Sequence, residues 1–360
     1  MKLNSISLTN YKNLNAEKLD FDDKINCLIG NNGVGKSNIL DAIYHLCCGK
    51  GYFNSNTSQN IKFKKDFFII EGIFNKKNKV QKIHCSAKRG GKKIIKRNNK
   101  SYDKISDHIG FLPLVIISPS DRDLISEGSS VRRKFIDGII SQTNNQYLNT
   151  LLKYNKVLIQ RNALLKHFLI NRTYDQDVLL VYNDQLELLG TPIHEERKKF
   201  IDVFSPIFER QYKGFCSSNE IVSLEYESSL NNHNFSNLLL NNLEKDRRSQ
   251  YTNVGIHKDD LLFKIHGESI NKFGSQGQQK SFLIALKLAQ FDFIKKKSSV
   301  SPIILLDDVF DKLDQKRVEL IMQLVEKNHF GQIFISDTHY DRSIAAIKTT
   351  QLSYKIFNLH

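Results

Sequence analysis

One short glycine-rich segment limits the possible folds of this chain more than any other feature. Residues 30–37 have the sequence GNNGVGKS, which fits the pattern GxxxxGK[ST]. The apolar run 25–29 precedes it, and apolar residues recur at helical spacing from Ile39 to Leu46 after it. A strand, a glycine turn and a helix in this order form a phosphate-binding loop, so we expect an α/β fold.

The residue types in this loop suit a nucleoside triphosphate. Glycines allow the tight turn that directs successive backbone N–H groups at phosphate oxygens. Lys36 is placed to reach the β- and γ-phosphates, and Ser37 to hold Mg²⁺ through its hydroxyl. We therefore predict that ATP and Mg²⁺ bind to a loop formed by Gly30, Asn31, Asn32, Gly33, Val34, Gly35, Lys36 and Ser37.

A second apolar strand carries the acidic residues that such a site requires. Residues 303–306 are apolar and are followed by Asp307 and Asp308. We predict that Asp307 is the Mg²⁺ partner, and that Asp308 orients an attacking water and is catalytic together with Lys36. The strands 25–29 and 303–306 are expected to be neighbours in one sheet.

A further apolar run, 333–335, is followed by two candidates for a residue that senses the γ-phosphate. These are Asp337 and His339, and the sequence does not decide between them. A surface histidine without such a role explains His339 equally well.

The segment 275–278 has the sequence SQGQ and opens a run of helical apolar spacing that extends to Ala289. Two interpretations fit it. Ser275 is a favourable N-cap for the helix. Its hydroxyl, the first backbone N–H groups and the helix dipole also form a site for an anion.

The basic residues of the chain are concentrated in one segment. The sequence has 53 Lys and Arg against 38 Asp and Glu, a formal net charge of +15. Residues 62–104 hold 15 of the basic residues and 3 acidic ones, and their apolar runs and turn residues predict an antiparallel meander. The basic side chains fit either a solvated sheet face or a surface for DNA phosphates. For the second interpretation, the predicted contacts are Lys88, Arg89, Lys92, Lys93, Lys96 and Arg97.

Other features exclude several classes of protein. The sequence has no run of 18 apolar residues, so a membrane-spanning helix is not expected, and its first residues lack the apolar core of a signal peptide. The five cysteines form no CxxC pair, which favours reduced, buried thiols. We therefore expect a cytoplasmic protein.

The three segments described above together resemble the ATP-binding cassette ATPases. That family carries an LSGGQ-type signature between its phosphate-binding loop and its carboxylate strand. Here 238 positions separate Ser37 from Ser275. So long a separation resembles the SMC branch of the family, in which a helical arm is inserted between the motifs.

Over nearly its whole length the chain resembles the RecF family. It departs from the family pattern at Lys12, Ile256 and Lys258, where the family has Arg, Pro and Arg. The changes from Arg to Lys keep the charge but lose the bidentate geometry. The segments that carry the resemblance are Leu8–Leu14, Ser118–Ile125, Arg132–Asp137, Tyr154–Lys166, Gly255–Leu261, Ser275–Lys280 and Leu306–Asp314.

The resemblance implies an ABC/SMC-type P-loop ATPase head with an inserted, mostly helical arm. We assign residues 1–117 and 246–360 to the head, with the basic β-meander at about 62–104, and residues 118–245 to the arm. The arm is either a passive spacer or an element that closes over DNA.

The arm is expected to contain several helices. We predict one helix over Val178–Leu189 that ends at Gly190, and another over Arg197–Tyr212 with Pro206 as an irregularity. A longer helix before them carries an apolar stripe formed by Tyr147, Leu148, Leu151, Leu152, Leu158, Leu165 and Phe168.

The resemblance also implies a mechanism and partners. ATP held by one protomer would be capped by Ser275, Gly277 and Gln278 of a second, so that ATP stabilises a homodimer that clamps gapped, single-stranded or double-stranded DNA. The implied role is DNA repair and replication, with RecO and RecR as partners and RecA as the protein that is loaded.

Hydrolysis is expected to be slow. Asp308 stands where most cassette ATPases have Glu, and its side chain is one methylene shorter. We therefore expect a weak, DNA-stimulated ATPase that acts as a switch. The alternative is a DNA-binding scaffold whose ATP site does not control dimerisation.

Overall fold

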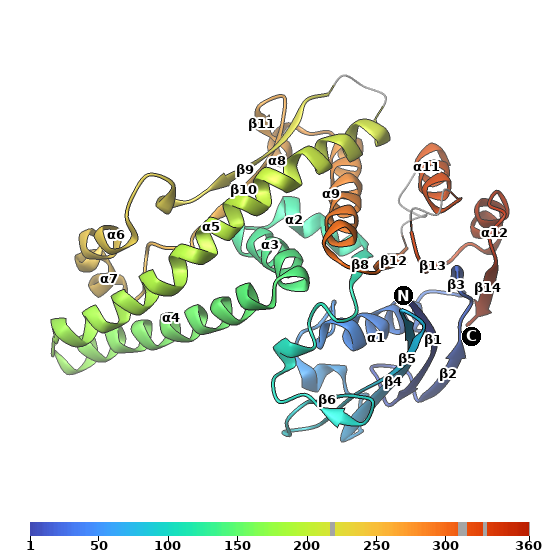
Figure 1. Cartoon of the computed structure of the whole chain (residues 1–360), viewed down its shortest axis with the longest axis horizontal. Helices are drawn as coiled ribbons and strands as arrows, with labels where there is room; N and C mark the ends of the chain where they lie inside the picture. Colours follow the sequence, from blue (N-terminus) through green and yellow to red (C-terminus); the bar gives the residue numbers. More distant parts are fainter. Residues whose placement is uncertain (217–219, 309–314, 327–329, 360) are drawn as a thin grey trace. The chain divides into compact units, whose positions relative to one another are not determined.

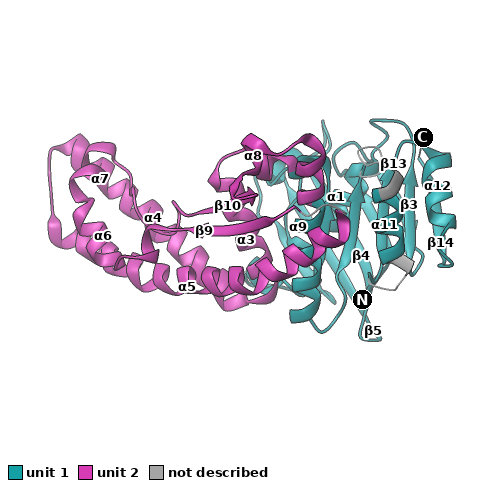
Figure 2. Cartoon of the chain, turned by 90° about the horizontal axis from the view of Figure 1, so that it is seen from above, with its two compact units in different colours: residues 1–121, 284–360 teal, residues 122–283 magenta. Residues whose placement is uncertain are grey.

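The computed structural model describes residues 1–216, 220–308, 315–326 and 330–359. The chain divides into two compact units (Figure 2). Unit 1 comprises residues 1–121 and 284–360, and unit 2 comprises residues 122–283. The helix α9 (Gln276–Lys297) begins in unit 2 and ends in unit 1.

The second boundary of the units differs from the sequence-based assignment, which put residues 246–283 with the head. These residues belong to unit 2 because β10 (Asp260–Ile265) pairs with β9 (Val222–Glu227), which lies between helices of that unit in the chain. Buried ion pairs within unit 2 also hold this segment to its helices, as described below.

A parallel sheet forms the centre of unit 1. Its strand order is β14-β3-β13-β12-β8, and each neighbouring pair is parallel. Four of the strands are almost fully buried, which explains their continuous apolar sequences. The strands are β3 (Ile25–Ile29), β8 (Leu114–Ile117), β12 (Ile303–Asp307), β13 (Ile333–Asp337) and β14 (Tyr354–Asn358).

One expectation for this sheet was wrong. The strands 25–29 and 303–307 are not neighbours, because β13 lies between them and pairs with both. The run 333–337 is as apolar as the other two strands and is therefore equally suited to the centre of the sheet.

An antiparallel sheet forms the second layer of unit 1, in the order β2-β1-β4-β5-β6-β7. Two of its turns have Asn or Lys in the left-handed conformation, at residues 77–78 and 98–99. Ile83 and Cys85 of β5 point into the core, as their alternation predicts. The strands are β1 (Lys2–Thr9), β2 (Ala16–Asp20), β4 (Phe67–Lys76), β5 (Lys79–Lys88), β6 (Ile94–Arg97) and β7 (Lys100–Ser101).

The helix α1 (Lys36–Cys48) lies between the two sheets (Figure 1). Its Ile39 and Leu46 share one core cluster with Phe74 of the antiparallel sheet and with Leu305 and Phe334 of the parallel sheet. Because α1 begins at the glycine loop, this packing fixes the loop against both layers. The remaining described helices of unit 1 are α11 (Gln315–Glu326) and α12 (Tyr340–Lys348), with short 3-10 turns at Thr57–Asn60 and Ile105–Asp107.

Unit 2 is mostly helical, and its longest helices, α4 (Asn145–Asn171) and α5 (Gln176–Phe215), pack side by side (Figure 1). The apolar stripe predicted for α4 is correct at Tyr147 and Leu165 but wrong at Leu152, which is exposed; Tyr154 is buried in its place. The other elements are α2 (Asp123–Ser126), α3 (Ser129–Thr143), α6 (Phe235–Asn241), α7 (Leu243–Ser249), α8 (Ile270–Phe273) and a small sheet in which β10 also pairs with β11 (Glu268–Ser269).

The helix α5 is continuous over 40 residues, so the predicted break at Gly190 was wrong. Gly190 does not end a helix. It allows close packing of α5 against Phe235 and Tyr154. A Cβ atom at this position would lie 2.4 Å from Phe235 Cε1 and 3.1 Å from Tyr154 Cε2. The helix therefore passes against α6 and α4 at a point where a larger residue does not fit.

This packing gives a test with a matched control. Gly190→Ala is expected to destabilise the protein by about 1–3 kcal/mol, because the new methyl overlaps two aromatic rings. Gly138→Ala lies within α3, where a Cβ meets open space, and is expected to stabilise by about 0.5–1 kcal/mol. Urea unfolding measures both, and a neutral Gly190→Ala would contradict the assignment.

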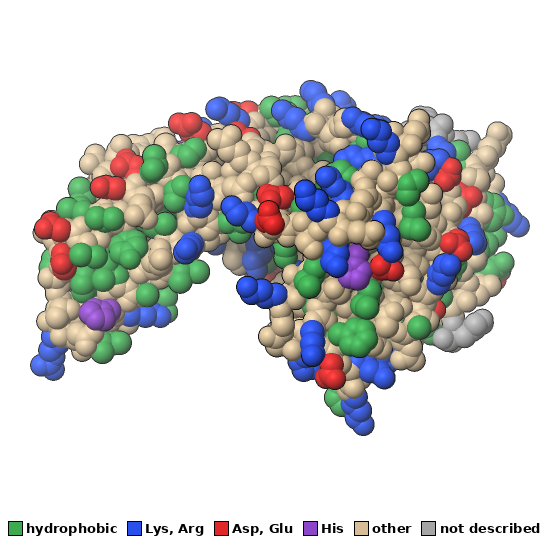
Figure 3. Space-filling model, turned by 60° about the horizontal axis from the view of Figure 1, so that its bottom comes forward, with side chains coloured by type: hydrophobic (Ala, Val, Ile, Leu, Met, Phe, Trp, Pro, Cys, Tyr) green, Lys and Arg blue, Asp and Glu red, His purple; other side chains and the backbone are tan. Residues whose placement is uncertain are grey.

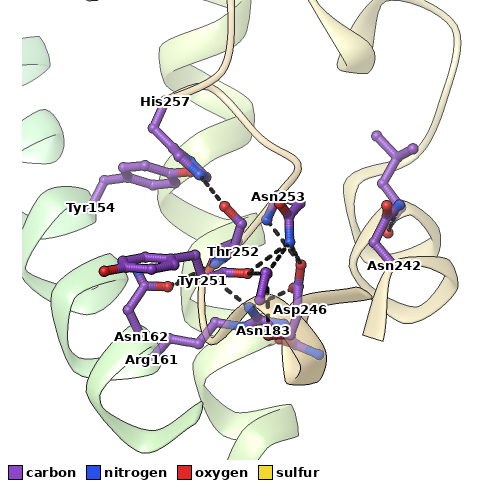
Figure 4. Close-up of polar contacts among 12 residues, drawn as sticks. Tyr154, Arg161, Asn162, Asn183, Asn242, Asp246, Tyr251, Thr252, Asn253 and His257 are labelled. Atoms are coloured by element: carbon purple, nitrogen blue, oxygen red, sulfur yellow. Dashed lines mark hydrogen bonds and ion pairs between the residues drawn. The ribbon is translucent and has the colours of Figure 1, made fainter. Parts of the chain in front are cut away.

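Buried polar side chains connect the helices of unit 2 with residues 246–259 (Figure 4). The fully buried Arg161 donates to Asp246 at 2.8 Å, to Asn183 at 2.8 Å and to Thr252 at 2.7 Å. Arg197 of α5 likewise pairs with Asp259 at 2.9 Å. Such pairs add little net stability but strongly penalise any arrangement that separates them.

In the same cluster His257 is held neutral. The hydroxyl of Tyr154 lies 2.9 Å from Nδ1, and Nε2 lies 2.9 Å from the Thr252 carbonyl oxygen (Figure 4). Because that carbonyl can only accept, Nε2 carries the hydrogen and Nδ1 accepts from the tyrosine. Burial lowers the pKa of His257 to about 4.

The lowered pKa predicts an acid sensitivity. The unfolded chain binds a proton near pH 6.5 and the folded protein near pH 4, so stability falls as the pH drops through this window. His257→Gln is expected to flatten this part of the stability profile, measured by urea unfolding at several pH values. His233→Gln, at an exposed position, serves as the control. Equal profiles for the two variants would refute the assignment.

Candidate functional site

The glycine loop connects β3 to α1 with the geometry of an anion site. Gly35 is the N-cap of α1 and has a φ of 108°, and a Cβ atom there would lie 2.7 Å from a methyl of Leu14. Glycine is therefore required at this position. The positive end of α1 directly follows the turn of the loop.

The two polar side chains of the loop, Lys36 and Ser37, both have hydrogen-bond partners in the structure. Lys36 is buried, and its ammonium donates to the carbonyl oxygens of Gly30 at 2.7 Å and Asn31 at 3.0 Å. The Ser37 hydroxyl donates to Asp307 Oδ1 at 2.8 Å, although 270 positions separate the two residues. The structure thus unites the glycine loop with the carboxylate strand.

A residue that sequence reasoning missed completes this group. Ser336 of β13 lies beside Asp307 in the register of the sheet, and its hydroxyl donates to Asp307 Oδ1 at 2.7 Å. The Ser336 hydroxyl oxygen in turn accepts from the backbone N–H of Asp308 at 3.0 Å. Ser336 therefore orients both acidic residues at once. A serine near the end of an apolar strand gives no sequence signal for this role.

The environment of Asp307 fits a cation site. Burial raises the pKa of its carboxyl above the usual value, and the hydrogen bonds from Ser336 and Ser37 oppose that shift. Carboxylate and hydroxyl oxygens are the ligands that Mg²⁺ prefers. The described residues contain no cluster of three or more His, Cys, Asp or Glu. A Mg²⁺ ion here would therefore depend on nucleotide phosphate as well as on Ser37 and Asp307.

The segment after β1 supports the loop from the other side. The Asn13 amide donates to the Gly33 carbonyl at 2.9 Å and accepts from Asn38 at 2.7 Å. Beside it, Lys12 pairs with the buried Asp41 of α1 at 2.6 Å, so this lysine is committed to an ion pair within unit 1.

The two candidate sensors differ in their surroundings. The Asp337 carboxylate is buried and accepts from the backbone N–H groups of Thr338 and His339, at 2.7 and 3.1 Å, and from the Ser343 hydroxyl. It therefore fixes the start of α12. The His339 side chain is exposed.

The segment 275–278 opens α9 with a reciprocal cap. The Gln278 N–H donates to the Ser275 hydroxyl at 3.2 Å, and the Ser275 N–H donates to the Gln278 side-chain oxygen at 2.8 Å. The Gln278 amide also donates to Glu220 at 2.8 Å. The N-cap interpretation is thus correct, and it leaves Ser275 exposed at the positive end of α9.

The predicted DNA contacts fall into two groups. Lys93 donates to the Gly49 carbonyl at the end of α1, and the Arg97 guanidinium lies 4.6 Å from the centre of the Phe111 ring. These two side chains are partly used within unit 1. Lys88, Arg89 and Lys92 are exposed, and Lys96 is half-buried. In the view of Figure 3, Lys and Arg side chains are distributed over the surface, with Asp and Glu side chains between them.

Comparison with known proteins decides the family. A family model described as RecF/RecN/SMC N terminal domain matches residues 2–355. The DNA replication and repair protein RecF of Flavobacterium johnsoniae is 56% identical over 359 residues, covering 100% of both chains. RecF of Phocaeicola vulgatus is 44% identical and covers 99% of this chain and 96% of the relative. The chain belongs to the RecF family.

Solved structures agree with this assignment. A structure of the recombination mediator protein RecF with ATP, from the RecFOR pathway, is 30% identical and has a TM-score of 0.88 over 94% of this chain and 92% of that one. An Smc head domain from Pyrococcus furiosus is 18% identical with a TM-score of 0.55, which supports the fold alone. The predicted RecF resemblance and the ABC/SMC-type α/β fold are confirmed.

No helix in the described part of the chain is long and apolar enough to cross a membrane. The motif residues Leu313 and Asp314, which carried part of the RecF resemblance, lie outside the described residues.

Ser336 provides the test of the site geometry. Ser336→Ala removes a hydrogen bond to a charged group, so we expect the Mg²⁺ concentration needed for ATP binding to rise about tenfold. Titration of a fluorescent ATP analogue at varied Mg²⁺ measures this. Ser343→Ala, which removes a similar bond to Asp337, is the control. An unchanged Mg²⁺ requirement in Ser336→Ala would show that Ser336 does not position the metal ligands.

Proposed function

We propose that this chain is an ATP-controlled DNA-binding protein of DNA repair and replication. The observation that carries the proposal is the Ser37–Asp307 hydrogen bond, which unites the glycine loop with the carboxylate strand in a RecF-family fold. The relatives named as DNA replication and repair proteins, and the solved RecF with ATP, support the biological role and the nucleotide.

ATP binds in this proposal to the loop 30–37. Lys36 exchanges its carbonyl partners for the β- and γ-phosphates, and Ser37 and Asp307 hold Mg²⁺. The ion would neutralise phosphate charge during hydrolysis. Asp308 orients the attacking water, and its short side chain favours slow turnover suited to a switch.

The exposed start of α9 supports the proposal that ATP causes dimerisation. Ser275 and the backbone N–H groups near Gly277 lie at the positive end of the helix. Ser275 caps this end and is exposed to solvent. The γ-phosphate of a second protomer suits this end. The Gln278 side chain accepts from the Ser275 N–H and donates to Glu220. Its role is therefore to position the start of the helix.

His339 is the better candidate for the residue that senses the γ-phosphate. The carboxylate of Asp337 is already occupied by the hydrogen bonds that begin α12. The exposed His339 comes just after the carboxyl end of β13, before α12 begins.

DNA would bind chiefly through its phosphates on the basic antiparallel sheet of unit 1. The exposed Lys88, Arg89 and Lys92 are the strongest of the predicted contacts, because Lys93 and Arg97 have partners within the unit. Action with RecO and RecR, and loading of RecA, belong to the same proposal and are supported by the RecFOR pathway named for the solved relative.

A charge placed at the dimer contact tests the mechanism. Ser275→Asp keeps a good N-cap, so α9 and ATP binding should be preserved. The carboxylate would repel the partner's γ-phosphate, and we expect ATP-dependent dimers to be lost. Light scattering with ATP, Mg²⁺ and duplex DNA measures the change.

Two further variants complete this experiment. Lys36→Ala is expected to abolish ATP binding and dimerisation together. Ser275→Thr keeps the hydroxyl and is expected to dimerise. If Ser275→Asp dimerises like the unmodified protein, the contact between protomers is wrong. DNA binding that persists unchanged in Lys36→Ala would favour a scaffold in which ATP is not a dimerisation switch.

A further inference from the structure

A single aromatic ring projects from a basic turn of unit 1. Phe63 has the most exposed large hydrophobic side chain in the described part of the chain, at 82%. The Lys64 ammonium lies 5.6 Å from the centre of its ring. Neither the nucleotide site nor the core of unit 1 uses this phenylalanine, so its exposure calls for another explanation.

The turn that carries Phe63 is fixed by hydrogen bonds at both ends. The Lys65 N–H donates to the Lys62 carbonyl at 3.0 Å, and the Lys62 N–H donates to the Asn10 carbonyl at 2.9 Å. Lys64 has a φ of 61°, a left-handed conformation that lysine seldom adopts. The ring is thus held outward by a turn whose strained conformation is maintained by its surroundings.

A second basic turn is attached to the first. The Arg89 N–H donates to the Asp66 carbonyl at 2.7 Å, and the Arg89 guanidinium donates to the Lys65 carbonyl at 3.3 Å. Lys88 pairs with Phe67 in the register of β4 and β5. We call the two turns, residues 62–66 and 88–92, the basic lip. Its cationic side chains are Lys62, Lys64, Lys65, Lys88, Arg89 and Lys92.

These observations favour one class of ligand. The cations of the lip suit a chain of phosphates, and its acidic residue is Asp66 alone. A duplex offers phosphates but keeps its bases stacked inside, so Phe63 would have no partner there. An unpaired base has a free π-face. By stacking on an exposed aromatic ring, the base removes its own face and that of the ring from water.

We propose that the basic lip is a binding site for single-stranded DNA, in which one unpaired base stacks on Phe63. The flanking phosphates lie on Lys64, Lys65 and Arg89. The inference rests on the proposed DNA-binding function and adds the residue, Phe63, on which an unpaired base would stack. Stacking needs no particular base, so the site tolerates any sequence.

The lip is also connected to the nucleotide loop. The Lys62 ammonium donates to the Asn13 carbonyl at 2.7 Å, and the Asn13 amide donates to the Gly33 carbonyl at 2.9 Å. A strand bound at Phe63 therefore lies two hydrogen bonds away from the glycine loop that receives ATP.

The test compares a DNA strand that carries bases with the same strand containing abasic sites. Affinities of the full chain, with ATP and Mg²⁺ at one salt concentration, are measured by fluorescence anisotropy for oligothymidylate and for the same strand with abasic sites. Phe63→Ala is expected to weaken binding of oligothymidylate roughly 5- to 150-fold. The same substitution should not change binding of the abasic strand. Phe63→Tyr keeps the ring and should restore the affinity.

Controls separate this proposal from DNA binding in general. Val80→Ala removes an exposed apolar side chain near the opposite end of the β4–β5 hairpin and should leave affinity unchanged. Blunt duplex should bind Phe63→Ala and the unmodified protein equally. Iodouracil in the strand should crosslink to Phe63.

Three outcomes would overturn the inference. Phe63→Ala could bind oligothymidylate as tightly as the unmodified protein, or it could lose the abasic strand to the same extent. In both cases DNA binding itself stands and the stacking role is wrong. If the unmodified protein binds none of these DNAs, the proposed function fails together with the inference.

Discussion

The nucleotide site depends on one carboxylate oxygen that accepts from two hydroxyls. Asp307 Oδ1 receives Ser37 from the glycine loop and Ser336 from the neighbouring strand. These hydrogen bonds partly offset the cost of burying the carboxyl group. They also hold three segments that are remote in the chain in one arrangement. Without them the loop, the carboxylate strand and β13 would still pack as apolar elements, but the cation ligands would not converge.

Unit 2 uses buried charge for a different purpose. Arg161 and Arg197 project from the two long helices and pair with Asp246 and Asp259 on the segment that returns toward α9. Apolar contacts alone tolerate sliding of one helix along another, whereas a buried ion pair that is broken costs several kcal/mol. The pairs therefore fix the segment that leads to Ser275, and with it the position of the start of α9.

The sequence located the segments of the site better than it predicted the contacts between segments. The glycine loop and Asp307 follow apolar runs, and such runs are visible without a structure. Ser336 was missed because only the register of β13 against β12 brings it to Asp307. Gly190 was assigned to a helix end because glycine often ends helices, whereas here contact with Phe235 requires it. Both misses concern contacts between segments, which local patterns do not encode.

The connection from the basic lip to the glycine loop also limits how DNA can influence ATP. Lys62 and Asn13 transmit a change only if their hydrogen bonds differ between the DNA-bound and free states. If DNA binding changes the affinity for ATP by some factor, ATP binding must change the affinity for DNA by the same factor. If those hydrogen bonds do differ, a lip next to the loop would couple DNA and ATP through unit 1 alone. The proposed dimerisation through Ser275 would then add to this coupling within each protomer.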